Sequence, residues 1–310
     1  MRKNDRGVIL LCEAADRLDK TVWCYTELRG LICGTAKGAQ SGKNRFGGSL
    51  EPFNEVELVL YEKEGTGRPI IESASIVDPT LSLREDWVTA LSLFSIAEVV
   101  IRLSPPQVAQ EKIYRLLKAV ISAARQRGDQ DRLLLYFLIW FLRLEGYVPV
   151  LEGCSRCGAP LTRGGEIFHS WQEGSFSCGG CARPGDFPLP PTFHLFLRTS
   201  RALSPSGFSE ISIPGEERVK HFFWEMARRQ AGRELGALEV CEKTRRYACK
   251  GGGNPTLKKG RQALEGIFGK GEGDLPLAKV PPLPLPHRID QGGVDDRRTR
   301  GEEDSERTSA

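Results

Sequence analysis

Alternation of apolar and polar positions dominates the first eighty residues and predicts five short β-strands. The clearest case is 52–61, where Val56, Leu58 and Leu60 alternate with glutamates. The other predicted strands are rich in apolar, β-branched or aromatic residues and cover Gly7–Cys12, Thr21–Thr26, Leu31–Ala36 and Pro69–Val77. Short strands with regular turn signals indicate a small antiparallel barrel. Five strands match the oligonucleotide-binding barrel called the OB-fold, although an SH3-like barrel fits the pattern nearly as well.

From Ser82 onward the apolar spacing becomes helical, with Ser82 or Asp86 as the first N-cap. Helices are predicted between Ser82 and Pro105, between Val108 and Gly128, and over 130–145, 193–203 and 216–236. The 130–145 helix is apolar nearly all round, so we expect it to form the core of an α-helical domain. We expect the 216–236 helix to pack back onto it. The fold class is therefore α+β.

Two Cys-x-x-Cys knuckles interrupt the helices, Cys154 with Cys157 and Cys178 with Cys181. This spacing is typical of a four-cysteine zinc site, with a small hairpin predicted between the knuckles. Four thiolates close the coordination shell and leave no position for water, which predicts one structural Zn²⁺ per chain. The alternatives are chance cysteine pairs or disulfides, which a reducing compartment disfavours. His169 could replace a cysteine, but the paired spacing argues against it.

The sequence offers no pattern typical of an enzyme. Gly38 and Gly42 are separated by three residues where a phosphate-binding loop needs four, and Asn44 stands where that loop needs Ser or Thr. A zinc deaminase needs His-x-Glu upstream of its Cys-x-x-Cys, and no such glutamate follows His169. No nucleophile–base pair or carboxylate pair stands out. We therefore expect a protein without catalytic residues.

Composition agrees with a soluble globular protein of two or three domains, with 310 residues, 40% hydrophobic and 27% charged. The longest apolar run, Leu133–Leu142, is too short to span a bilayer. The run Val8–Cys12 is also too short for a secretory signal. These features, with nine cysteines, predict a cytoplasmic protein without membrane contact.

Positive charge is concentrated in residues 1–48, which hold nine Lys/Arg against five Asp/Glu, a net charge of +4. Within it, residues 37–48 carry Lys37, Lys43 and Arg45, four glycines and no acidic residue. Cations neutralise phosphates, and Phe46 offers a ring on which a base could stack, which indicates a nucleic-acid contact. The alternative is a solvated loop with Phe46 folded onto the barrel as a lid. A second basic region, for which a solvated helix face is favoured, consists of Arg228, Arg229, Arg233, Arg245 and Arg246.

After Lys250 the composition changes to glycine runs, a proline run over 281–286 and mixed charges. Such a segment buries too little apolar surface to offset its ordering entropy, so we expect a disordered tail. The proline run is interpreted as a spacer, or as a polyproline II ligand. The predicted domains are a barrel over 1–80, a helical domain over 81–150 and 188–249 that encloses a four-cysteine module over 151–187, and the tail over 250–310.

Several short segments of the sequence resemble the bacterial RecO family of DNA-repair and recombination-mediator proteins. Gly30–Ile32 leading to Ala36–Ala39 is similar to that family's third strand and basic loop. Arg45-Phe46 followed by Leu50–Phe53 resembles its entry into the fourth strand, and Leu144–Leu151 before the first knuckle resembles its entry into the zinc module. The resemblance covers roughly residues 5–245.

The resemblance implies an N-terminal OB-fold, a helical domain and an embedded zinc site. It implies a protein that binds single- and double-stranded DNA, anneals strands and helps to load recombinase on DNA coated by single-strand-binding protein. The implied DNA contacts are Lys37, Lys43, Arg45 and Phe46, and the implied zinc ligands are Cys154, Cys157, Cys178 and Cys181. Some members of the family lack these cysteines, so zinc is not central to the shared activity. Association with the bacterial nucleoid is also implied.

The implied protein partners are RecR and the acidic, phenylalanine-ending tail of single-strand-binding protein. Such a tail needs an apolar slot rimmed by cations, and we place it on the second predicted helix, beside Lys112, Arg115, Lys118 and Arg125. The main alternative function is a protein-interaction adaptor with a structural zinc site and no direct DNA contact.

Overall fold

The computed structural model describes residues 1–15, 18–62, 68–84, 86–126, 128–161, 165–232, 234–239 and 241. The chain divides into two units, Met1–Gly271 and Glu272–Ala310, and every described residue belongs to the first. The predicted disordered tail, its proline run, and Arg233, Arg245 and Arg246 lie outside the described residues. The proposed domain limits stay predictions.

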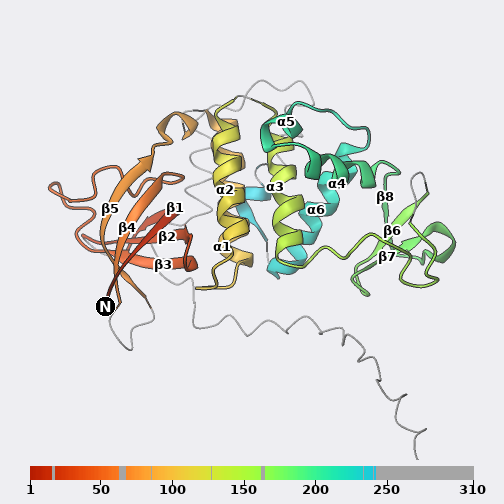
Figure 1. The fold of residues 1–310 in the computed structure, drawn as a ribbon, viewed down its shortest axis with the longest axis horizontal. Helices are drawn as coiled ribbons and strands as arrows, with labels where there is room; N and C mark the ends of the chain where they lie inside the picture. Colours follow the sequence, from red (N-terminus) through yellow and green to blue (C-terminus); the bar gives the residue numbers. More distant parts are fainter. Residues whose placement is uncertain are drawn as a thin grey trace, which may run out of the picture. The chain divides into compact units, whose positions relative to one another are not determined.

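The N-terminal strands form a closed barrel (Figure 1) in the order β1-β2-β3-β5-β4. They are β1 (Arg2–Ala14), β2 (Lys20–Thr26), β3 (Gly30–Ala36), β4 (Glu55–Tyr61) and β5 (Ile70–Asp78). All neighbours pair antiparallel except β3 and β5, which meet in parallel at Thr35 and Ile70. Five strands in this closed arrangement confirm the predicted OB-fold barrel.

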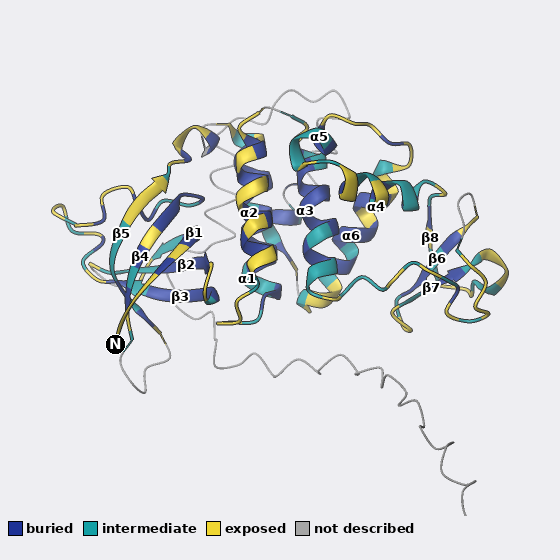
Figure 2. Cartoon of the chain, in the orientation of Figure 1, coloured by how far each residue is buried: buried dark blue, intermediate teal, exposed yellow. Residues whose placement is uncertain are grey.

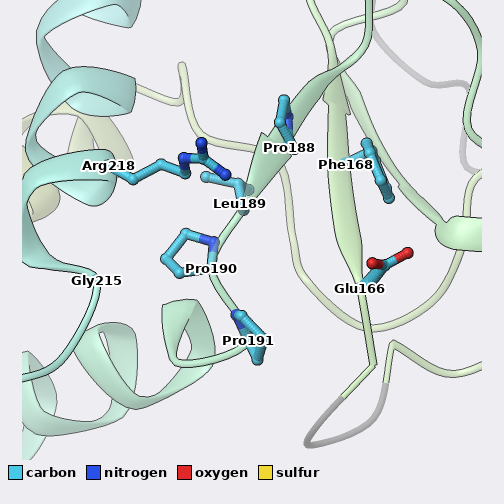
Figure 3. Close-up of a pocket in the computed structure, with 8 residues that line it drawn as sticks. All are labelled: Glu166, Phe168, Pro188, Leu189, Pro190, Pro191, Gly215 and Arg218. Carbon is cyan, nitrogen blue, oxygen red and sulfur yellow. The ribbon is translucent and has the colours of Figure 1, made fainter.

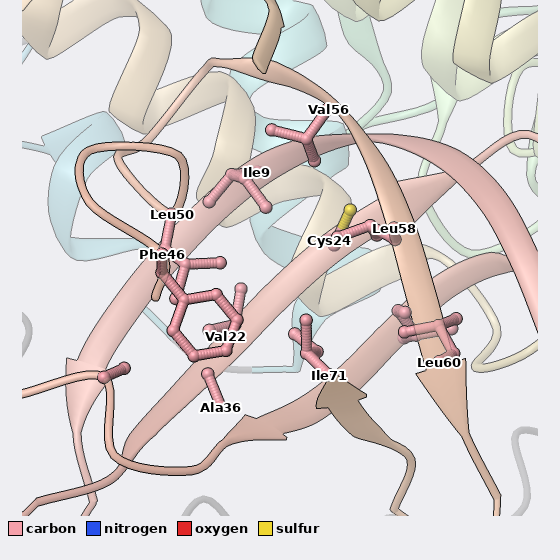
Figure 4. Close-up of a cluster of buried hydrophobic side chains, with 12 residues drawn as sticks. Ile9, Val22, Cys24, Ala36, Phe46, Leu50, Val56, Leu58, Leu60 and Ile71 are labelled. Carbon is pink, nitrogen blue, oxygen red and sulfur yellow. The ribbon is translucent and has the colours of Figure 1, made fainter. Parts of the chain in front are cut away.

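Each strand of the barrel alternates its side chains between the interior and the outside. In β4, Val56, Leu58 and Leu60 are buried in the interior while Glu57 is exposed. Figure 4 shows these side chains meeting Ile9 and Ile71 from other strands. The alternation visible in the sequence is therefore the pattern of the barrel core.

Six α-helices are described after the barrel and a short 3₁₀ turn over Leu81–Arg84. They are α1 (Trp87–Leu103), α2 (Glu111–Ala124), α3 (Gln130–Leu144), α4 (Phe193–Ala202), α5 (Pro205–Ser209) and α6 (Glu216–Ala231). Asp86 caps α1 by accepting from the Thr89 backbone N–H, and Asp129 caps α3 in the same way. Of the two N-caps considered for the first helix, Asp86 is therefore the one used.

Helix α3 is the core of the helical part, in contact with α1, α2, α4, α5 and α6. Figure 2 shows it buried along most of its length. The Arg132 guanidinium on α3 lies 3.0 Å from the Glu216 carboxylate on α6, and this ion pair joins the two helices. The predicted packing of the last long helix against the apolar one is confirmed.

The four-cysteine module contains a small sheet in the order β7-β6-β8. Its strands are β6 (Ile167–Ser170), β7 (Ser175–Cys178) and β8 (Phe187–Leu189), of which β6 and β7 form the predicted hairpin. Phe222 of α6 packs its ring against His169, Trp171 and Phe176 of this hairpin. Aromatic contacts therefore attach the module to the helices.

Polar contacts link the barrel to α2. Glu55 of β4 accepts a 2.9 Å hydrogen bond from the Tyr114 hydroxyl and lies 2.7 Å from the Lys118 ammonium group. Arg125 lies 2.8 Å from the Asp78 carboxylate at the end of β5.

Among the described helices, none is both long and apolar enough to cross a membrane.

Candidate metal centre and nucleic-acid interface

The structure brings the four cysteines of the two knuckles together. The sulfur atoms of Cys154, Cys157, Cys178 and Cys181 all lie within 4.8 Å of one another, and those of Cys157 and Cys178 are 3.8 Å apart. In a tetrahedron with metal–sulfur bonds of about 2.3 Å, neighbouring sulfurs lie about 3.8 Å apart. The donor set and its spacing therefore fit one thiophilic metal ion.

Backbone turns aim the peptide groups at the sulfur atoms. The Gly158 N–H donates to the Cys154 carbonyl at 2.9 Å, and Gly158 adopts a φ of 73°, which favours glycine. Hydrogen bonds from the backbone of Cys178 and Cys157 lower the pKa of Cys154 to about 6. The neighbouring thiols instead raise the pKa of Cys181 to about 12. Four sulfur atoms at this spacing could hold one metal ion.

An arginine between the first two cysteines braces the module. The Arg156 guanidinium lies 3.1 Å from Glu173 and 2.8 Å from Asp186, and it also donates to the Cys181 carbonyl. The hydrogen bond from Arg156 lowers the pKa of Asp186. The sequence analysis missed this network, because spacing alone does not reveal which acidic residues reach an arginine inside a knuckle.

His169 is not part of the sulfur cluster. Its side chain is 2% exposed and its ring packs between Trp171, Phe176 and Phe222. Its Nδ1 atom has no hydrogen-bond partner among the described residues. Burial lowers the pKa of His169 to about 4; the Arg229 charge also lowers it, and Asp186 opposes the shift. The ring is therefore neutral and serves as packing.

Acid is expected to destabilise the fold through His169. Because its folded pKa lies below the unfolded value of about 6.5, the stabilisation is present above pH 6.5 and is lost as the pH falls toward 4. Between pH 7 and pH 5 the loss is about 2 kcal/mol in the free energy of unfolding. Urea unfolding at both pH values should show this loss in the wild type and a smaller one in His169→Leu. The matched control is the exposed His221→Asn, and an equal loss in all three proteins would contradict the prediction.

The loop between β3 and β4, residues 37–54, is held in place by local hydrogen bonds. The Gly38 N–H donates to the Asp19 carboxylate at 2.8 Å, and the Gln40 N–H donates to the Leu18 carbonyl at 2.9 Å. The Asn44 side chain accepts from the backbone N–H groups of Phe46 and Gly47. These contacts order the loop while the side chains of Lys37, Lys43 and Arg45 remain exposed.

Phe46 does not offer its ring to a stacked base in this structure. Its side chain is 4% exposed and belongs to the barrel core (Figure 4), where it lies among Val22, Ala36 and Leu50. The alternative interpretation, a lid on the barrel, describes this position. Burial of an aromatic ring next to an open barrel end removes more apolar area from water than its exposure on a loop.

The Arg45 guanidinium lies over the ring of Phe46. Its guanidinium carbon is 4.9 Å from the centre of the Phe46 ring, and its Nε donates to the Glu72 carbonyl at 2.6 Å. One face of this cation is therefore engaged with the barrel. The exposed part of the guanidinium still contributes positive charge beside Lys43.

Cations elsewhere on the barrel differ from those of the loop. Those of β1 are ion-paired, Arg2 with Glu72, Lys3 with Glu62 and Arg6 with Glu57. Within the described chain, Lys37, Lys43 and Arg45 have no such ion pair. Among the described residues, no ion pair neutralises the positive charge of these three side chains.

The β2–β3 face, which OB-folds commonly use for oligonucleotides, is closed here. Its aromatic side chains, Trp23 and Tyr25, are buried. The Gln107 N–H donates to the Leu31 carbonyl at 2.8 Å, and a Cβ added at Gly30 would lie 2.0 Å from the Val108 carbonyl. The segment between α1 and α2 thus covers the end of this hairpin. The loop after β3 remains an exposed cationic feature of the barrel.

Three of the four cations proposed for a peptide pocket on α2 form ion pairs within the chain. Lys118 and Arg125 form ion pairs with the barrel, Arg115 lies 3.6 Å from Glu111 of its own helix, and Lys112 is exposed. On α6, both Arg228 and Arg229 pair with Glu225, at 2.8 and 2.7 Å. Arg229 also lies over the Trp171 ring, 4.7 Å from its centre, so both cations are engaged within the protein.

Comparison with known proteins places most of the described residues in one family. The family model "Recombination protein O N terminal" matches residues 1–80, and "Recombination protein O C terminal" matches residues 84–221. The DNA repair protein RecO of Anaeromyxobacter dehalogenans strain 2CP-C is 28% identical over 235 residues, 74% of this chain and 92% of the relative. That of Anaeromyxobacter sp. strain K is 32% identical over 197 residues, 64% of this chain and 76% of the relative. That of Syntrophobacter fumaroxidans is 29% identical over 240 residues, 76% and 95% of the two chains. This chain belongs to the RecO family of DNA repair proteins.

Proposed function

We propose that this chain is a DNA-binding recombination mediator that anneals single strands and helps to load recombinase on DNA coated by single-strand-binding protein. The observation that carries the proposal is the loop after β3, where Lys37, Lys43 and Arg45 are exposed and lack an acidic partner among the described residues. Membership of the RecO family supplies the repair context. The proposed role needs no catalytic residue.

Cations on an ordered loop suit a sugar–phosphate backbone. Each Lys or Arg that meets a phosphate releases condensed counterions, which favours binding without regard to sequence. Anchoring by Phe46 and Asn44 holds the loop before DNA arrives, so less conformational entropy is lost on binding. Neutralised phosphates repel a second strand less, which favours annealing. The same contacts serve single strands and duplex.

We further propose that Cys154, Cys157, Cys178 and Cys181 hold one Zn²⁺. Bound zinc would supply folding free energy rather than reaction chemistry, because four sulfurs fill its tetrahedral shell. The proposed protein partners are RecR and the acidic tail of single-strand-binding protein. The proposed location is the bacterial cytoplasm, at the nucleoid.

A salt-titrated binding assay tests the proposal, with single-stranded DNA, duplex and an acidic phenylalanine-ended peptide measured side by side. We expect the affinity for both DNA forms to fall steeply as salt is added. A plot of the logarithm of the affinity against the logarithm of the salt concentration should be linear. Binding of the peptide without measurable DNA binding would instead support the adaptor function and contradict the mediator function.

Phe46→Leu is expected to leave oligonucleotide affinity nearly unchanged, because leucine still fills the barrel end that Phe46 occupies. If a base stacked on the ring, removal of the aromatic face would lower affinity about fivefold or more. Fluorescence anisotropy with a short single strand measures the difference. Phe46→Ala is the companion variant, which we expect to lower barrel stability by about 3–5 kcal/mol. A large loss of affinity in Phe46→Leu with stability retained would show a stacking role.

A further inference from the structure

Exposure to solvent distinguishes one of the four clustered cysteines from the other three. Cys157 is exposed, and it is the only exposed cysteine among the eight that the structure describes. Cys154, in the same knuckle, is 3% exposed. Cys24 and Cys33 of the barrel are buried, and so is Cys241. Among the described sulfur atoms, that of Cys157 is therefore the most accessible to a dissolved oxidant.

The nearest recorded partner of this sulfur belongs to the other knuckle. Cys178 Sγ lies 3.8 Å from Cys157 Sγ, although 21 residues separate the two positions. The sulfurs of a disulfide are about 2.05 Å apart, so this pair must approach by only about 1.8 Å. The fold thus brings one exposed sulfur within reach of a second one across the cluster.

Contacts that involve no sulfur hold the first knuckle against β7. The Ser155 N–H donates to the Phe176 carbonyl at 2.9 Å, and the Ser155 and Ser175 hydroxyl oxygens are 2.9 Å apart. These contacts join the first knuckle to the strand that ends at Cys178. They keep Cys157 opposite Cys178 without help from a metal, so the pair stays aligned while the ligands react.

We propose that Cys157 and Cys178 form a reversible oxidation site for hydroperoxides, at which a disulfide between the two knuckles replaces two metal ligands. The inference rests on the zinc site proposed above. In the first step the Cys157 thiolate attacks the terminal oxygen of the hydroperoxide, and the O–O bond breaks. The sulfur becomes a sulfenic acid, and hydroxide or an alkoxide leaves.

The second step closes the disulfide. The Cys178 thiolate attacks the sulfenic sulfur of Cys157, an S–S bond forms and hydroxide leaves. The two sulfurs together lose two electrons, which reduce the O–O bond. With two protons from the solvent, hydrogen peroxide yields two waters, and an organic hydroperoxide yields one water and one alcohol.

The metal is expected to leave when this disulfide forms. Cys154 and Cys181 remain as thiolates, and two sulfurs cannot close a tetrahedral shell. A dithiol reductant would return all four ligands by exchange. The reaction would act on the module and spare the barrel, whose cysteines are buried or half-buried. Cytosolic disulfides are usually transient or redox-sensing, which suits a bond of this kind.

The test maps the disulfide in the full-length, zinc-loaded protein after treatment with hydrogen peroxide. Free thiols are alkylated, the protein is digested with trypsin, and linked peptides are identified by mass spectrometry. Trypsin cleaves after Arg156, between the two cysteines of the first knuckle. A bond between Cys157 and Cys178 links peptides 157–163 and 164–198, whereas a bond inside the first knuckle links 144–156 to 157–163. We expect the cross-knuckle product, with release of zinc to a chromogenic chelator in parallel and reversal by dithiothreitol and added zinc.

Cys157→His is the variant to compare, because histidine is a zinc ligand without a sulfur to oxidise. We expect it to keep one zinc and to release it about tenfold or more slowly than the wild type under peroxide. Cys12→Ala removes a half-buried barrel cysteine and is the matched control, which should release zinc as the wild type does. Equal release from Cys157→His and the wild type would overturn the inference. If Cys157→His binds no zinc, the disulfide map of the wild type decides.

The outcomes separate the oxidation site from the metal site. A wild type without zinc before treatment would contradict the proposed metal site, and with it the release step. Zinc that stays bound at a peroxide dose that oxidises free glutathione would contradict the oxidation site alone. Disulfides confined within each knuckle, or equal oxidation of Cys24 and Cys33, would also overturn it.

Discussion

Cys157→Ser is expected to lose the metal and most of the stability of the four-cysteine module. A serine hydroxyl does not ionise to replace a thiolate, and three remaining sulfurs cannot close the tetrahedral shell. Structural Zn²⁺ contributes an apparent free energy of about 10–16 kcal/mol in zinc-finger peptides. We expect the unfolding free energy of the module to fall by at least about 4 kcal/mol. Losses of this size are exceptional for single substitutions and are typical of the loss of a metal.

Metal analysis by mass spectrometry and limited proteolysis measure this outcome. The wild type should carry one zinc per chain and resist cleavage between the knuckles, and the variant should do neither. Cys12→Ala is the matched control, because Cys12 lies on β1 outside the sulfur cluster. A Cys157→Ser protein that keeps one zinc and its resistance to protease would contradict the assignment.

DNA binding should survive this change in part. The barrel has its own core, formed by residues of the first five strands and the loop after β3. The module instead attaches to the helices through Phe222 and its aromatic neighbours. We therefore expect zinc loss to lower the stability of the module clearly and to leave the salt dependence of DNA binding largely unchanged.

The triple variant Lys37→Ala/Lys43→Ala/Arg45→Ala should bind DNA with a flatter dependence on salt. Each lost phosphate contact removes about 0.7 from the slope for single strands and about 0.9 for duplex. Loss of all three would therefore lower the slope by about 2 for single strands and by nearly 3 for duplex. The largest loss of affinity is expected at low salt. The fold should be retained, because these side chains are exposed and Phe46 keeps its place in the core.

The barrel provides a control of equal charge, Arg2→Ala/Lys3→Ala/Arg6→Ala. It removes three cations that are already paired with Glu72, Glu62 and Glu57. We expect its salt slope to remain close to that of the wild type. Equal flattening in both triple variants would mean that net charge, and not the loop, governs binding, and would contradict the site assignment.

Local patterns in the chain were enough to predict most of the elements. The period-two alternation in β4 is visible because one side of each strand meets the barrel core and the other meets solvent. The apolar run of α3 predicted a central helix, since a helix buried on all sides has no polar face. Knuckle spacing predicted that the four cysteines lie together, because two residues between sulfurs allow one turn to bring both to the same point.

Long-range contacts decided the rest. Whether Phe46 faces solvent or the core depends on the space that the five strands leave at the end of the barrel. No local sequence pattern encodes that space. The loss of Lys118 and Arg125 from the expected pocket depends on Glu55 and Asp78, far away in sequence. A groove lined by Phe168 of β6, Leu189 of β8 and Arg218 of α6 (Figure 3) likewise joins strands of the module to a helix that begins more than twenty residues later. The sequence by itself determined the strands, helices and knuckles, because these depend on neighbours along the chain. Only the tertiary structure decided which cations stay unpaired, because an ion pair forms wherever folding brings opposite charges together.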